Sequence, residues 1–135
     1  TADINQSTIN LINKLVKLKR LVINNSKMKS AVFHLDELEY LDLSDNSLEN
    51  IDGSFNSLVY VKLSNNKFKS IDKSLLKSDK IKYIDLNFNL IDRININQLI
   101  LPKSIIEVNI FNNELQNETI DSLNLKFPKI FNTKW

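Results

Sequence analysis

The sequence predicts an α/β solenoid built around one parallel β-sheet, because a short apolar pattern recurs along almost all of its 135 residues. Five segments of eleven residues have an apolar side chain at their positions one, four, six and eleven, and they begin at Leu18, Leu38, Leu58, Ile81 and Ile105. Four of the five have Asn at position nine, and successive position-nine residues lie 20, 20, 23 and 24 residues apart. A near-constant period of this length is typical of stacked repeat architectures.

Each segment predicts a strand with one buried face, because its residues three to seven alternate between apolar and polar. In the second copy, Leu41 and Leu43 are expected to point into the core. Connections of about 15 residues then return the chain, so that the strands run parallel. The returns carry a second apolar set, such as Leu48, Ile51 and Phe55, and we expect them to be extended or 3₁₀. One repeat cannot bury its own apolar edge, so neighbouring repeats must stack.

The pattern resembles the segment L-x-x-L-x-L-x-x-N-x-L of the leucine-rich repeat family, over roughly residues 15 to 131. This resemblance implies a short right-handed superhelix with a concave parallel sheet, and a scaffold for protein–protein recognition without catalysis. The position-nine side chains are Asn46, Asn66, Asn89 and Asn113. An Asn amide can satisfy backbone groups that a bend leaves unpaired, so we interpret these four residues as a ladder that stabilises the scaffold.

We expect one domain over residues 1–135, with an N-terminal cap at 1–17, five repeats at 18–115 and a C-terminal cap or partial repeat at 116–135. The first cap carries apolar residues at helical spacing, namely Ile9, Ile12, Leu15 and Val16, and we expect it to be helical or irregular. In the last cap, Asn117 is predicted to be the N-cap of a helix and Pro128 to end it. The predicted core face of that helix is Ile120, Leu123 and Phe127.

The chain begins with Thr1 instead of Met, and Phe127 and Ile130 are placed to open a sixth strand. We therefore expect the sequence to be a fragment of a longer protein.

Position three of the repeats is the first candidate for a binding surface. It holds Arg20, Tyr40, Tyr60, Tyr83 and Glu107, and it faces the concave side of the predicted sheet. Adjacent strands lie about 4.8 Å apart, so the three tyrosines are expected to stack. Tyrosine favours strands and stabilises them through cross-strand contacts, and it is also enriched in protein interfaces. Both interpretations apply here, and we predict that the tyrosines anchor a partner protein or peptide.

Charged and aromatic residues extend this candidate surface. Position five holds Asp42, Lys62 and Asp85, whose alternating signs predict ion pairs across the strands, either as a solvated face or as a determinant of partner choice. Phe88 and Phe111 fall outside the core pattern and predict an exposed apolar patch, unless the longer return after Phe88 folds over them. The predicted concave partner-binding residues are Arg20, Tyr40, Asp42, Tyr60, Lys62, Tyr83, Asp85, Phe88, Glu107 and Phe111.

The composition argues against catalysis, metal binding and cofactor binding. There is no cysteine, and His34 is the one histidine, so a zinc site or a catalytic triad lacks its residues. A chain with Gly53 as its one glycine has no glycine-rich phosphate loop. The net charge of +2 and the absence of a long apolar run predict neither nucleic-acid binding nor membrane insertion. The lysine-rich segment 67–83 is interpreted as a solvated face, with a phosphate-binding patch as the alternative.

Two other functions are compatible with the sequence. The chain could be the targeting or substrate-recognition part of a larger protein, since residues 101–115, LPKSIIEVNIFNNEL, resemble repeats of bacterial pathogen effectors. It could also be a secreted or surface recognition module, and three glycosylation sequons begin at Asn5, Asn24 and Asn117. The lack of cysteine favours a reducing compartment, so we predict a cytoplasmic protein. We expect a monomer unless the sheet edges pair.

Overall fold

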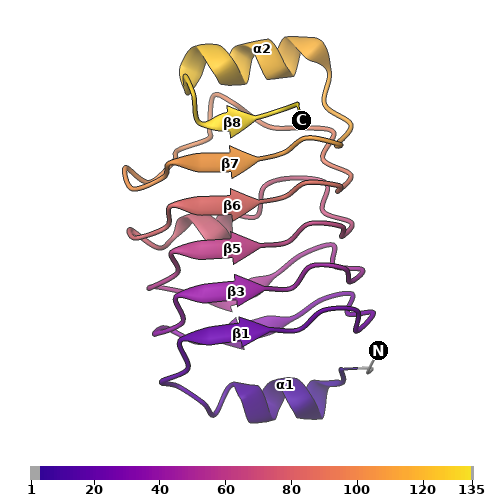
Figure 1. Cartoon of the computed structure of the whole chain (residues 1–135), viewed down its shortest axis with the longest axis vertical. Coiled ribbons are helices and arrows are strands. Elements are labelled where there is room, and N and C mark those ends of the chain that lie inside the picture. Colours follow the sequence, from indigo (N-terminus) through magenta and orange to yellow (C-terminus); the bar gives the residue numbers. More distant parts are fainter. Residues whose placement is uncertain (1–3, 135) are drawn as a thin grey trace.

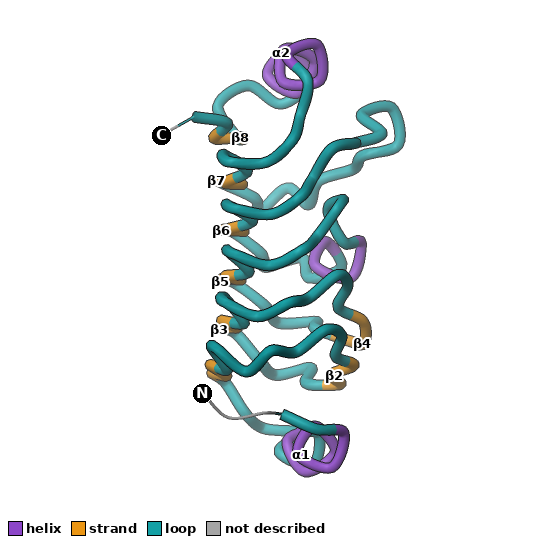
Figure 2. Tube along the Cα trace, turned by 90° about the vertical axis from the view of Figure 1, so that its right-hand side faces the viewer, coloured by secondary structure: helices purple, strands orange, loops and turns teal. Residues whose placement is uncertain are grey.

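The computed structural model describes residues 4–134, which form a six-stranded parallel sheet with few helices (Figure 1). The strand order follows the sequence: β1 (Arg20–Val22), β3 (Tyr40–Asp42), β5 (Tyr60–Lys62), β6 (Tyr83–Asp85), β7 (Glu107–Asn109) and β8 (Phe131–Asn132). Figure 2 shows these strands along one side and the return segments along the other. The arrangement is compatible with a solenoid-like fold. Residues 1–3 and 135 of the two predicted caps lie outside the described residues.

The five predicted strands are present, but β1, β3, β5, β6 and β7 span three residues each instead of five. The reason is a bend that follows each strand. Position eight adopts a left-handed backbone with φ between 54° and 59°, in Asn25, Asp45, Asn65, Phe88 and Asn112. Asn and Asp tolerate this conformation better than other side chains. The bend turns the chain away from the sheet directly after position seven.

The predicted asparagine ladder is confirmed. The Asn66 amide nitrogen donates to the carbonyl groups of Leu43 and Leu63 at 3.0 and 3.2 Å, and its oxygen accepts from the Leu48 N–H at 2.9 Å. Asn46, Asn89 and Asn113 make equivalent bonds to their own bend and to the repeat before it. Each amide therefore joins two neighbouring repeats and satisfies buried backbone groups.

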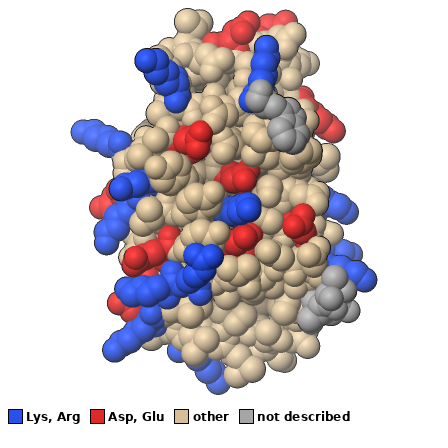
Figure 3. All heavy atoms as spheres, in the orientation of Figure 1, with Lys and Arg blue, Asp and Glu red and all other residues tan. Residues whose placement is uncertain are grey.

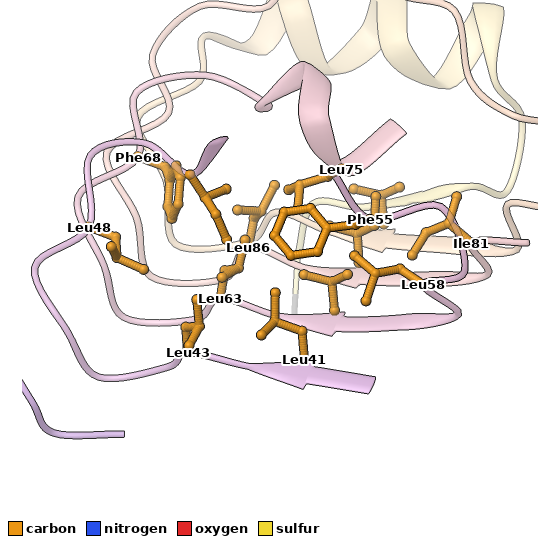
Figure 4. Close-up of a cluster of buried hydrophobic side chains, with 14 of the residues drawn as sticks. Leu41, Leu43, Leu48, Phe55, Leu58, Leu63, Phe68, Leu75, Ile81 and Leu86 are labelled. Atoms are coloured by element: carbon orange, nitrogen blue, oxygen red, sulfur yellow. The ribbon is translucent and has the colours of Figure 1, made fainter. Parts of the chain in front are cut away.

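The core lies between the sheet and the return segments, as Figure 4 shows for its central cluster. Leu41 and Leu43 point inward from the second repeat and are fully buried. Leu48, Ile51 and Phe55 of the following return meet them and are fully buried too. The second apolar set predicted for the returns therefore closes the core on the side opposite the strands.

The returns contain more regular structure than the sequence predicts. Two of them pair as a small parallel sheet, β2 (Val32–His34) with β4 (Asp52–Ser54), and the next forms the 3₁₀ helix η1 (Lys73–Leu76). The expectation of extended or 3₁₀ returns is confirmed in these segments, since β2 and β4 are extended and η1 is 3₁₀. Gly53 permits the β2–β4 pairing, because a Cβ atom there would lie 1.7 Å from the Phe33 carbonyl oxygen and its φ is +120°.

The N-terminal helix is shorter than its apolar spacing predicts. Helix α1 (Gln6–Ile12) begins at the N-cap Asn5 and buries Ile9. The chain turns after Asn13, so Leu15 and Val16 lie outside the helix and are exposed, and the cap is helical in its first part and irregular in its second. Asn13 has another role, because its amide donates to the Val32 carbonyl at 3.0 Å and accepts from the His34 N–H at 2.9 Å. The Asn13 side chain thereby pairs with a backbone carbonyl and an N–H group at the outer edge of β2, as a neighbouring strand would.

Helix α2 (Asn117–Lys126) covers the other end of the sheet (Figure 1). The prediction that Asn117 caps it is wrong, because Gln116 has the extended cap conformation and Asn117 is already helical. Of the predicted core face, Leu123 is buried, while Ile120 and Phe127 are half-buried. The sixth strand begins later than predicted, at Phe131, because the chain turns through Pro128 and through Lys129 with φ 66°.

Candidate functional site

The surface of the six-stranded sheet that turns away from the core carries most of the predicted binding residues, and we call it the sheet face. Alternation along each strand places positions three, five and seven of every repeat on this face. The register aligns position three across the sheet: Arg20 opposite Tyr40, Tyr40 opposite Tyr60, Tyr60 opposite Tyr83, and Tyr83 opposite Glu107. The five position-three residues predicted from the sequence therefore form one continuous row across the sheet.

The tyrosines of this row stack as predicted. The rings of Tyr40 and Tyr60 lie 5.2 Å apart at an interplanar angle of 18°, and those of Tyr60 and Tyr83 lie 5.7 Å apart at 39°. The Arg20 guanidinium carbon lies 3.8 Å from the centroid of the Tyr40 ring, a cation–π contact that extends the stack by one residue. All three tyrosines are half-buried. We call Arg20, Tyr40, Tyr60 and Tyr83 the aromatic row.

The predicted ion pairs at position five do not form. Lys62 lies between Asp42 and Asp85 in the sheet register, yet among the described residues no ion pair joins it to either carboxylate. Each carboxylate instead accepts a bond of 3.0 Å from the backbone N–H two residues later, in Ser44 and Asn87. A side chain that satisfies its own bend in this way is a common use of Asp after a strand. Asp42 is buried as a result.

Burial and charge shift the pKa values of two groups near the centre of the sheet face. Burial raises the pKa of the Asp85 carboxyl above its ordinary value, although the Asn87 N–H and the Lys62 charge act against that shift. Burial also raises the pKa of the Tyr60 hydroxyl, and the Asp85 charge adds to this. Tyr60 therefore stays a neutral hydrogen-bond donor at physiological pH, and the centre of the face is partly desolvated before any partner arrives.

Charge on the sheet face is mixed in sign. Figure 3, in the orientation of Figure 1, shows acidic and basic side chains interleaved over the middle strands, with large uncharged areas around them. Such a pattern gives no strong electrostatic field of one sign over this face.

Two polar features of this face were not predicted. Position seven lies on it as well, and the Ser64 hydroxyl donates to the Ser44 hydroxyl at 3.2 Å. The Asn132 amide of β8 donates to the Glu107 carboxylate and, at 2.6 Å, to the Asn109 side-chain oxygen. Asn132 pairs with Asn109 and therefore occupies position five of the sixth strand. Aligning Phe131 with position four of the repeats would have identified Asn132 as a residue of the sheet face.

Phe88 and Phe111 come together at the end of the sheet face where the strands finish. Their ring centroids lie 6.1 Å apart at 80°, an edge-to-face contact. Phe88 is 45% exposed, so the longer return does not cover it. That return, between β6 and β7, extends on the side opposite the strands (Figure 2). The structure thus brings together two aromatic rings that the repeat pattern leaves outside the core.

The returns carry His34, the one histidine of the sequence. His34 lies on β2, where its Nδ1 is 3.4 Å from the Ser54 hydroxyl. No group of three or more His, Cys, Asp or Glu side chains in this described range is placed to hold a metal ion. None of its helices has the length and apolar character needed to span a bilayer.

The sheet face is thus an ordered, half-buried aromatic row with mixed charges beside it and an aromatic pair at one end. These features must be interpreted from their own chemistry, since comparison with protein-family models and with curated proteins finds no match for this chain.

Proposed function

We propose that this chain is a leucine-rich-repeat solenoid whose sheet face is the concave surface that binds a partner protein or peptide, without catalysis. The observation that carries the proposal is the aromatic row. Tyr and Arg are the residues most often found at the energetic centre of protein interfaces, together with Trp. Here four of them stand side by side on one face, at contact distances of 3.8 to 5.7 Å.

The stacking supports binding because it reduces the entropy that association must overcome. Ordering a flexible side chain at an interface costs about 0.5–1.5 kcal/mol. The rings of Tyr40, Tyr60 and Tyr83 are already held by one another and by the sheet register. A partner therefore meets a surface whose large side chains are largely pre-positioned, and it can cover apolar ring area while the three hydroxyl groups accept or donate hydrogen bonds.

The aromatic pair gives a second line of support. Phe88 has φ 57° at position eight, where the other four repeats have Asn or Asp. An aromatic residue in this conformation costs on the order of 1–3 kcal/mol in backbone strain. Such strain points to a role for the ring itself, and Phe88 is exposed. The pair extends the proposed interface from the tyrosines toward the carboxyl ends of the strands.

The charged residues are proposed to select the partner. Lys62 stands between the two aspartates without an ion pair to either, so its ammonium group can contact a partner acid. Glu107, which lies next to Tyr83 in the position-three row, favours a basic side chain of the partner. Contacts of this kind change association rate and specificity more than total affinity.

The experiment is affinity capture from the native source with two immobilised variants. Tyr40→Ala/Tyr60→Ala/Tyr83→Ala should lose the partner that the wild-type chain retains, while Leu125→Ala should retain it. Leu125 is a matched control because it is an exposed apolar residue on α2, away from the sheet face. Circular dichroism establishes that both variants are folded. Equal partner capture by wild-type and triple-variant chains would rule out the aromatic row as the binding site.

A further inference from the structure

A second concave site lies on the return side of the molecule, away from the sheet face. It is a pocket of about 490 Å³ between the segment 70–76 and the long return that links β6 to β7. Residues of both segments line it. This volume is within the range of small-molecule sites, about 300–1,000 Å³.

The first wall of the pocket is held by hydrogen bonds to the preceding repeat. Asp72 caps η1 by accepting from the Ser74 N–H at 3.1 Å, and it also accepts from the Ile51 N–H at 3.0 Å. The buried Ser74 hydroxyl donates to the Ile51 carbonyl at 2.8 Å. Lys73 and Leu76 are therefore presented to the pocket by a fixed turn of helix.

The second wall is held from the opposite direction, by α2. The Lys126 ammonium group donates to the carbonyl groups of Ile96 and Leu99 at 2.5 and 3.3 Å. A charged donor shared by two carbonyl groups is a strong contact for a loop of this length. With both walls tied to other elements, the pocket is formed in the absence of a ligand, which lowers the cost of binding one.

The lining has two chemical parts. Five aliphatic side chains make the walls, namely Ile71, Leu76, Ile94, Leu99 and Ile100. The charged lining residues are Lys73 and Arg93, and both are cationic and exposed. The contact of Arg93 with Asp92 uses its Nε atom, at 3.2 Å, and a guanidinium group has further N–H donors for another acceptor. The lining thus combines an aliphatic part with two cations.

We propose that this pocket binds a free anionic amphiphile, a small molecule with an aliphatic chain of medium length and a carboxylate head group. The chain would lie against the five aliphatic side chains, and the head group would accept hydrogen bonds from Lys73 and Arg93. The lysine-rich segment 67–83 contributes one of these two cations. The proposal is independent of the sheet face, because no lining residue belongs to a strand of that sheet.

The test is a titration of the ¹⁵N-labelled chain with decanoate below its micellar concentration, followed by amide chemical shifts. We expect saturable shifts confined to residues 70–76 and 93–100. Decyltrimethylammonium, which has the same chain and the opposite charge, should bind at least about tenfold more weakly, as expected when two ion contacts are lost. No saturable shift with decanoate, or equal binding of the two amphiphiles, would overturn the proposal. So would shifts that map to the sheet face.

Variants separate the pocket from general surface effects. Ile100→Glu should abolish the shifts, and Leu125→Glu should leave them unchanged, although both replace apolar residues that are more than 80% exposed. Lys73→Glu/Arg93→Glu should reduce decanoate affinity about tenfold, whereas Lys80→Glu, in the same lysine-rich segment but outside the pocket, should not. If an acetylated Glu-Leu-Leu peptide shifted these residues and decanoate did not, the pocket would be a peptide site and the amphiphile proposal would be wrong.

Discussion

Replacing Asn66 by Ala tests whether the asparagine ladder holds the repeats together. The substitution leaves the Leu48 N–H without its partner, and it removes one of the two amide donors from the carbonyl groups of Leu43 and Leu63, which also accept from Asn46 and Asn89. The Asn66 side chain is 7% exposed, so water reaches these groups poorly. A buried polar group left unpaired costs about 1–3 kcal/mol. Taking the middle of this range for the one group left unpaired, we expect Asn66→Ala to destabilise the fold by about 2 kcal/mol.

The assay is urea and thermal denaturation followed by circular dichroism. A loss of about 2 kcal/mol corresponds to a fall in Tm of roughly 7 °C for a chain of this size. Native-state hydrogen exchange adds a local measurement, because the Leu48 amide should lose protection more than amides of distant repeats.

Asn56→Ala is the matched control. Asn56 is exposed in a neighbouring turn, so its replacement should change stability by less than about 0.5 kcal/mol. A loss below about 1 kcal/mol in Asn66→Ala would refute the reasoning, since it would mean that water replaces the amide without cost.

Three further substitutions test the return sheet, the centre of the sheet face and the aromatic pair. Gly53→Ala should prevent native β2–β4 pairing, because the added Cβ would meet the Phe33 carbonyl oxygen at 1.7 Å; a urea midpoint equal to that of the wild-type chain would contradict this. Asp85→Asn should stabilise the chain near neutral pH and have no effect at about pH 3. Burial raises the folded-state pKa of the Asp85 carboxyl, so the folded state favours the protonated form, and this stabilisation is lost as pH rises through that pKa. The Asn side chain stays neutral and does not lose it. Urea titrations at both pH values measure the difference, exposed Asp79→Asn is the control, and a destabilised variant at neutral pH would show that the sign is wrong. Phe88→Asn should change the free energy of unfolding by less than about 1 kcal/mol, since relief of left-handed strain offsets the lost ring contact, yet it should weaken capture of the partner proposed for the sheet face. Unchanged capture would remove Phe88 from the interface.

Much of the sheet could be predicted because its information is local and repeated. The apolar pattern sets which side chains face inward, and the constant period places equivalent positions of successive copies next to one another. The alignment of Tyr40, Tyr60 and Tyr83 follows directly, as does the contact of each position-nine Asn with the repeat before it. Errors concentrate at the ends, where no neighbouring copy constrains the chain. There, Gln116 caps α2 in place of Asn117, and Leu15 lies outside α1.

The sequence by itself determined the repeat, the direction and register of the strands, and the row of tyrosines, because each depends on spacing along one chain segment. Only the tertiary structure decided how individual polar groups are used and where separate returns meet. Asp42 and Asp85 accept hydrogen bonds of 3.0 Å from backbone N–H groups instead of pairing with Lys62. The geometry of the bend decides this, and the alternation of charges in the sequence does not reveal it. The pocket arises because η1, the long return and Lys126 of α2 lie close together in space. The sequence of each segment taken alone does not predict this proximity.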